Sequence, residues 1–279
     1  MRRGTDGLRD RVRRLLAVFM LIVGGAVALV VPAAPAMANS CILNPGHSFD
    51  GHYSSEYGSN GTLQGVRATI YNFGTGSPRI CNPAQGTSPP SDSSAWSMVA
   101  ATDCGGFGYF QAGYLHTNLS GAPGSTYNYF FTEHAYCDHA EATSYYGIPN
   151  YGQYYCYSVF HSGLTHTWYA QAINSQDCSS GTVVAQRTIN DCCLGYTPRQ
   201  MQWFTEMFDH SNSSYNNSTS DSPCGYPTNH CTFNHLGYRS LDGVWHSVQQ
   251  SVAYDPDCGY HDATNSATSF AVWPDFSYC

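Results

Sequence analysis

The sequence predicts an all-β protein: a disulfide-rich sandwich of two antiparallel sheets. Short segments rich in β-branched and aromatic residues alternate with clusters of Gly, Ser, Asn and Pro, and no long stretch has helical periodicity. The chain holds 22 tyrosines, a residue type that favours strands. Its 12 cysteines all follow Ala38, which is typical of a scaffold held by disulfides in an oxidising compartment.

Each strand is predicted from a short β-rich run that turn-forming residues bound on both sides. The expected strands cover residues 65–71, 95–101, 107–116, 126–134, 153–160, 166–172, 182–188, 200–208, 232–239, 244–251 and 269–273. Residues 74–92 and 210–227 are rich in turn formers and are expected to be loops. No repeat of fixed period and no linker divides this region, so we expect one domain.

The N-terminus has the pattern of an export signal. Six arginines precede an apolar run over residues 15–31, and Ala36-Met37-Ala38 then supplies the small-x-small pattern of a cleavage site. We expect a signal peptide at 1–38, an irregular segment at 39–60 and a single β-sandwich domain at 61–279. The alternative is an uncleaved membrane anchor, for which the run is slightly short. The predicted location is secreted and extracellular, with no membrane contact after cleavage.

The charge of the mature chain excludes two classes of partner. The chain has no lysine, and cleavage after Ala38 leaves five arginines and 17 acidic residues, so the net charge becomes 5 − 17 = −12. Because phosphate binding needs clustered basic residues, we expect no nucleic-acid partner and no anionic membrane surface. Charged residues are 11% of the chain, against about 25% in typical soluble domains. Such a surface is common in extracellular proteins that meet neutral polymers, so a glycan or a polypeptide is the expected partner.

The cysteines are expected to be structural. They stand at positions 41, 81, 104, 137, 156, 178, 192, 193, 224, 231, 258 and 279, an even number that allows up to six bridges. Spacing does not determine their connectivity. The adjacent Cys192 and Cys193 are expected to bond to different partners, because a disulfide between neighbours strains the peptide that joins them. None is expected to serve as a nucleophile or a metal ligand.

Two expected strands carry polar residues among large apolar ones. Side chains alternate between the faces of a strand, so Tyr109 and Gln111 share one face with Leu115. On the strand at 200–208, Gln202, Phe204 and Glu206 likewise share a face. A buried amide needs partners, and burial of Glu206 would raise its pKa, as a general acid or base requires. The alternative is a surface-facing or hydrogen-bonded glutamate without a catalytic role.

These two motifs resemble those of the secreted glutamic peptidases of the eqolisin type and, less closely, of the neprosin-like group. Gln111 in Gln-Ala-Gly matches the eqolisin Gln-Thr-Gly strand, and Trp203 and Glu206 can be aligned with the Glu-Trp-Ile-Val-Glu strand. An alignment on Trp203 places Gln202 at the first glutamate of that motif. The resemblance covers residues 65–207 and implies a concanavalin-like sandwich of two curved antiparallel sheets.

The resemblance also implies a mechanism. Glu206 would take a proton from the water that attacks a peptide carbonyl, and the Gln111 amide would donate to the developing oxyanion. No metal or other cofactor would be needed. If the first glutamate of the motif is the catalytic one, however, this chain has Gln202 in its place.

Three functional hypotheses follow. The leading one is binding of an extracellular polymer, a glycan before a peptide, on the concave sheet around Tyr109, Gln111, Gln202, Trp203 and Glu206. The second is an acid-active glutamic endopeptidase that uses Gln111 and Glu206. The third is a structural or interaction protein of the cell surface without a small ligand.

Other chemistry finds less support in the sequence. Residues 133–141 hold six possible metal ligands, but their spacing matches no zinc motif, so no metal site is predicted. A glycosidase would need two close carboxylates, and Glu133 is one residue that could partner Glu206. No Gly-x-Ser-x-Gly elbow occurs, so a serine hydrolase of that type is not predicted.

Overall fold

The computed structural model describes residues 46–54, 63–72, 93–103, 108–117, 129–136, 139–162, 167–190, 200–209, 230–253 and 259–275. All of them belong to one unit, Ala38–Cys279. The predicted signal peptide, its cleavage site and the loop at 210–227 lie outside the described residues. No helix in these ranges is long and apolar enough to cross a membrane.

Strands make up nearly all of the regular structure. In chain order they are β1 Gly46–Ser54, β2 Leu63–Asn72, β3 Ser93–Asp103, β4 Gly108–Thr117, β5 Tyr129–Tyr136, β6 His139–Tyr145, β7 Gln153–His161, β8 Thr167–Asn174, β9 Thr182–Asn190, β10 Gln200–Asp209, β11 Cys231–Ser240, β12 Trp245–Ser247, β13 Val252–Ala253, β14 Gly259–Ser266 and β15 Ser269–Asp275. Each predicted strand coincides with one of these in whole or in part.

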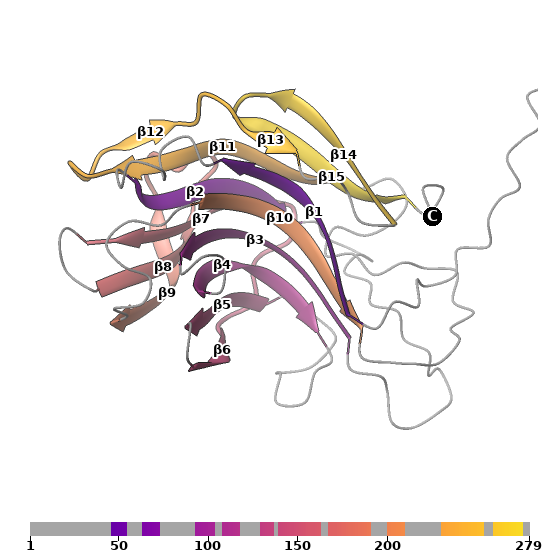
Figure 1. Cartoon of the computed structure of the whole chain (residues 1–279), viewed down its shortest axis with the longest axis horizontal. Coiled ribbons are helices and arrows are strands. Elements are labelled where there is room, and N and C mark those ends of the chain that lie inside the picture. The colour runs from indigo at the N-terminus through magenta and orange to yellow at the C-terminus, as the bar shows by residue number, and fades with distance from the viewer. Residues whose placement is uncertain are drawn as a thin grey trace, which may run out of the picture. The chain divides into compact units, whose positions relative to one another are not determined.

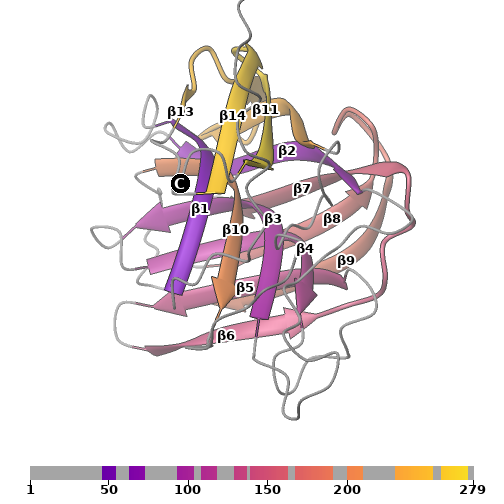
Figure 2. The same ribbon diagram turned by 90° about the vertical axis from the view of Figure 1, so that its right-hand side faces the viewer.

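The strands form two antiparallel sheets. Sheet A has the order β13-β1-β10-β3-β4-β5-β6, and sheet B has the order β14-β15-β11-β2-β7-β8-β9, with β12 paired to β11. In Figure 1 the two sheets lie in separate layers, and in Figure 2 the strands of sheet A lie in front of β2, β7, β8 and β9. The predicted all-β sandwich of antiparallel sheets is therefore confirmed.

The main core fills the space between the sheets. Its largest fully buried side chains are Trp168, Trp203, Tyr114, Tyr157 and Phe110. They come from both sheets, because alternate residues of each strand point inward. A smaller buried cluster of Met98, Leu115 and Phe131 lies on the other face of sheet A, with Tyr145 and Phe204 packed against it.

One segment differs from the prediction. Residues 39–60 were expected to be irregular, but β1 lies within them and pairs with β10 along its whole length, from Gly46 opposite Asp209 to Ser54 opposite Met201. The reason is that the buried positions of β1 include Asp50, His52 and Ser54. A half-buried strand is usually recognised by apolar residues at every second position, and in β1 these positions are polar.

Disulfides hold part of sheet B. Cys156 on β7 is bonded to Cys178 in the loop after β8. The Arg67 guanidinium on β2 donates from Nη1 to the Cys178 backbone oxygen over 3.1 Å, so the loop is held at two points. Cys231 also forms a disulfide. The pairs expected for Cys192 and Cys193 lie outside the described residues.

Candidate functional site

A row of polar side chains crosses the outer face of sheet A, the face away from the main core. Residues directly opposite each other in neighbouring antiparallel strands share a face. The register places Gln202 of β10 opposite Ala100 of β3, Ala100 opposite Gln111 of β4, and Gln111 opposite Glu133 of β5. Thr143 of β6 lies opposite Glu133 and extends the row.

Gln111 and Glu133 are joined directly at the centre of this row. The Gln111 Nε2 donates to Glu133 Oε1 over 2.7 Å. The Tyr109 hydroxyl donates to the same oxygen over 3.0 Å, and the Thr143 hydroxyl donates to Oε2 over 2.7 Å. Both carboxylate oxygens therefore accept hydrogen bonds from neutral donors, which fixes the orientation of the carboxylate.

The pair is nearly buried, whereas its neighbours reach the surface. Gln111 is 4% exposed and Glu133 is 9% exposed. Tyr109, Thr143 and Gln202 are partly exposed. The aromatic side chains of Tyr145 and Phe204, also partly exposed, occupy the next row of the same face. The outer face thus presents hydroxyl, amide and aromatic groups around a fixed carboxylate.

Glu206 lies on the same face but far from Gln111. It stands four residues beyond Gln202 on β10, opposite Trp96 of β3. From strand dimensions, the positions of Gln111 and Glu206 are about 13 Å apart along the strands and about 10 Å apart across them. One water molecule cannot bridge that distance, so the structure does not bring the predicted Gln111–Glu206 dyad together.

Trp203 has a different role from the predicted one. Its side chain is fully buried in the main core, and its Nε1 donates to the Arg67 backbone oxygen on β2 over 2.9 Å. Because Trp203 alternates with Gln202 and Phe204 along β10, it faces sheet B. Its place among the predicted ligand-binding residues is therefore wrong. Gln202 does face outward, and its Nε2 donates to Gln200 Oε1 over 2.9 Å.

His134, the neighbour of Glu133, faces the core. Its ring packs edge-on against Phe110, with centroids 6.1 Å apart. Burial and the nearby positive charge of Arg187 lower the pKa of His134 to about 4. The imidazole is therefore neutral at neutral pH, and Glu133 has no cationic histidine beside it on β5.

The two possible metal ligands of the 133–141 segment whose side chains the structure describes do not converge. Glu133 and His134 point to opposite faces of β5, as neighbours on a strand must. Among the described side chains, no group of three or more His, Cys, Asp or Glu residues could hold a metal ion. Cys137 and Asp138 lie outside the described residues.

Comparison with solved structures supports the fold class. No family model and no curated protein matches the chain. The chain is similar to a crystal structure of scytalido-glutamic peptidase with a transition state analog inhibitor, at 13% identity and a TM-score of 0.53, over 82% of this chain and 98% of that one. It is also similar to SCP-B, a member of the eqolisin family of peptidases in complex with the tripeptide Ala-Ile-His, at 13% identity and a TM-score of 0.45, with the same coverage.

A weaker likeness is to the κ-carrageenase of Pseudoalteromonas carrageenovora in complex with an oligotetrasaccharide, at 13% identity and a TM-score of 0.25, over 54% of this chain and 52% of that one. At these identities the comparisons bear on the fold and not on the activity. The scytalido-glutamic peptidase likeness agrees with the sandwich of two antiparallel sheets that the strand order defines.

Proposed function

We propose that the protein is exported and binds an extended, uncharged extracellular polymer, a glycan, on the outer face of sheet A. The observation that carries this proposal is the Gln111–Glu133 pair, whose carboxylate is fixed by the donors of Tyr109, Gln111 and Thr143. A fixed carboxylate among neutral hydrogen-bonding groups suits a ligand rich in hydroxyl groups, since each sugar hydroxyl both donates and accepts.

The surroundings of the pair support the same ligand class. Tyr145 and Phe204 flank the polar row and are partly exposed, so their rings can pack against the apolar faces of sugar rings. Gln202 and Thr143 extend the row on either side of the pair, across several strands. A row of this length fits a chain of several sugar residues rather than one small molecule.

Binding can be tested on the uncharged insoluble glycans chitin and cellulose by measuring the protein depleted from solution. Tyr145→Ala and Gln202→Ala should weaken binding, because both remove partly exposed contacts. Gln171→Ala is the matched control, because Gln171 forms a comparable exposed pair with Gln186 (2.7 Å) on sheet B. Unchanged binding in both sheet A variants, or equal loss in the control, would contradict this location.

A second function is favoured by one observation. The 2.7 Å bond places the Gln111 amide and the Glu133 carboxylate side by side, on a fold similar to that of a glutamic peptidase. In this hypothesis Glu133, in place of Glu206, takes the proton of an attacking water, and Gln111 donates to the oxyanion.

The hydrolytic hypothesis predicts cleavage of casein that pepstatin does not inhibit. Cleavage should be abolished in Glu133→Gln and retained in Glu206→Gln. The reverse pattern would restore Glu206 as the base, whereas the absence of cleavage from pH 3 to 7 would leave binding as the function of this face.

A further inference from the structure

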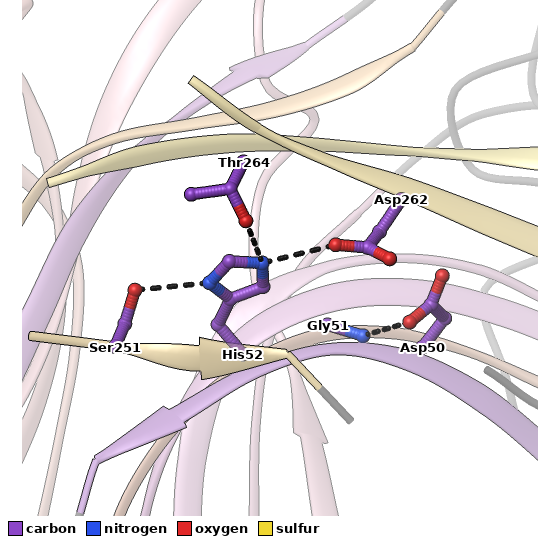
Figure 3. A network of polar contacts seen from close by, with 6 residues as sticks. All are labelled: Asp50, Gly51, His52, Ser251, Asp262 and Thr264. Atoms are coloured by element: carbon purple, nitrogen blue, oxygen red, sulfur yellow. Dashed lines mark hydrogen bonds and ion pairs between the residues drawn. The ribbon is translucent and has the colours of Figure 1, made fainter. Parts of the chain in front are cut away.

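A serine, a histidine and an aspartate from three separate segments meet at one flank of the sandwich. His52 lies on β1, Ser251 directly precedes β13, and Asp262 lies on β14 (Figure 3). The Ser251 hydroxyl is 2.9 Å from His52 Nδ1, and Asp262 Oδ2 is 3.1 Å from His52 Nε2. The imidazole therefore stands between a hydroxyl and a carboxylate, with one ring nitrogen facing each.

These contacts select one tautomer of the imidazole. An ionised carboxylate only accepts hydrogen bonds, so Nε2 must carry the proton that faces Asp262. Nδ1 is then the basic nitrogen, and the Ser251 hydroxyl donates to it. Thr264 Oγ1 also lies 3.4 Å from Nε2. This is the arrangement in which a histidine accepts a proton from a serine while a carboxylate orients the ring.

The ring is held rigidly and excluded from water. His52 is fully buried, and its imidazole stacks on Phe270 with centroids 3.9 Å apart and an interplanar angle of 6°. The Asp262 side chain is 15% exposed, and Ser251 is partly exposed. Burial lowers the pKa of His52 below its usual value, although Asp262 opposes this shift. The base is thus neutral at neutral pH, and solvent reaches the residues on both sides of it, Ser251 and Asp262, but not the imidazole itself.

We propose that Ser251, His52 and Asp262 form an acyl-transfer site that acts on small carboxylic esters. Ser251 Oγ attacks the ester carbonyl and forms the new C–O bond, while its proton moves to His52 Nδ1. The tetrahedral intermediate expels the alcohol, which takes that proton from His52, and leaves an acyl group on Ser251. Water then attacks the acyl carbonyl with His52 again as base, which releases the carboxylic acid and restores the Ser251 hydroxyl. This site is independent of the polymer-binding face proposed above.

A second serine–histidine pair supplies an internal comparison. Ser240 Oγ is 2.9 Å from His246 Nε2, and Ser240 also bonds to the Asp242 carboxylate. Here the carboxylate contacts the serine instead of the far nitrogen of the histidine. The hydroxyl donates a single proton, and Asp242 and the Val244 backbone oxygen compete for it with the imidazole. Ser240 is therefore expected to be unreactive.

The test uses the full secreted chain and an alkyl fluorophosphonate, followed by mass mapping of the modified residue. Attack by Ser251 on phosphorus forms a P–O bond, expels fluoride and passes the proton to His52. One adduct at Ser251 is expected, with none in Ser251→Ala and an unchanged adduct in Ser240→Ala. Hydrolysis of p-nitrophenyl acetate should follow the same pattern. An unmodified Ser251, or an adduct at Ser240 instead, would overturn the proposal.

The Asp262→Asn variant distinguishes a catalytic site from a serine hydroxyl that is only accessible to the reagent. It keeps the shape of the side chain but loses the carboxylate, so the labelling rate should fall on the order of 100-fold. Asn265→Ala, a change at an exposed position of the same strand, should leave the rate unchanged. The wild-type rate should also fall at acid pH, where His52 becomes protonated. If Asp262→Asn labels as fast as the wild type while its circular dichroism spectrum and melting temperature are unchanged, the array is not a catalytic site.

Discussion

Gln111 and Glu133 lie directly opposite each other on β4 and β5, and the Gln111 amide donates to the Glu133 carboxylate over 2.7 Å. This cross-strand contact places the charge of Glu133 at the centre of the outer face of sheet A. Two further donors hold the same carboxylate, so the group can contact a ligand without first changing its orientation.

Removing the Gln111 side chain should destabilise the fold. Gln111→Ala takes one donor from a nearly buried carboxylate, which should lower the free energy of unfolding by about 2 kcal/mol. Urea denaturation at pH 7 measures the change. Gln202→Ala is the matched control: its partly exposed amide bonds to Gln200, so its effect should stay within about 0.5 kcal/mol. Equal effects would show that Glu133 does not depend on Gln111.

Trp203 should matter for stability and not directly for ligand contact. Trp203→Phe removes the donor to the Arg67 oxygen and leaves a void between the sheets. We expect a loss of about 2–4 kcal/mol in guanidinium denaturation. Trp245→Phe, at a partly exposed ring that lies 4.7 Å from the Arg67 guanidinium, should cost less than about 1 kcal/mol. If the Trp203→Phe protein is fully folded but no longer binds the polymer, Trp203 contacts the ligand and its assignment as a purely structural core residue is wrong.

The fold should weaken as the pH falls from about 6.5 to about 4. In this range an unfolded histidine takes up a proton, whereas His134, with its pKa lowered to about 4, does not. The unfolded state then binds more protons and is favoured, by on the order of 3 kcal/mol once the pH is below 4. Stability at pH 7 is unaffected, because both states are neutral there.

Denaturation curves at several pH values between 4 and 7 measure this dependence. In His134→Leu the slope of stability against pH should flatten, and the part that remains belongs to groups such as His52, whose pKa burial also lowers. An unchanged slope would show that groups other than His134 cause the loss of stability at acid pH. The result also bears on function. A peptidase active near pH 3–5 would have to work in the pH range in which the sandwich is less stable.

The Cys156–Cys178 bridge should contribute to stability through the loop that it closes. The two cysteines are 22 residues apart, which corresponds to about 3 kcal/mol in the chain-entropy model. The double change Cys156→Ala and Cys178→Ala tests this by thermal denaturation. It should also release the loop that Arg67 holds, so proteolysis should begin within residues 175–181. Cleavage that begins elsewhere would show that Arg67 alone keeps the loop in place.

The sequence predicted most strands because their inward residues are apolar. β2 has Leu63, Val66, Ala68 and Ile70 among its buried side chains. β1 escaped prediction because Asp50 and His52 occupy buried positions in it. The strands β6 and β14 were missed as well, and both combine charged, polar and small residues without regular alternation.

The candidate site was predicted in part. The two-residue period of a strand predicted that Tyr109 and Gln111 share one face of β4 and that Gln202 and Phe204 share one face of β10, as they do in the structure. Applied strictly, the same period excludes Trp203 from the ligand-binding residues, because neighbours on a strand point to opposite faces and Gln202 points outward. Glu133 was not among the predicted site residues, because the sequence does not determine the register between β4 and β5. Predicted strands ending at 116 and starting at 126 would put Phe131 opposite Gln111, whereas the observed register puts Glu133 there.

The His52–Asp262 pair has a counterpart on the opposite flank, where Arg187 of β9 donates from Nη1 to the Ala142 backbone oxygen of β6. Polar contacts between the sheets therefore occur at both flanks. Many β proteins place lysines on their outermost strands to repel strands of other molecules. This chain has no lysine, and Arg187 is the one cation on β9. The same guanidinium thus joins the two sheets and supplies the charge that discourages edge-to-edge aggregation along β9.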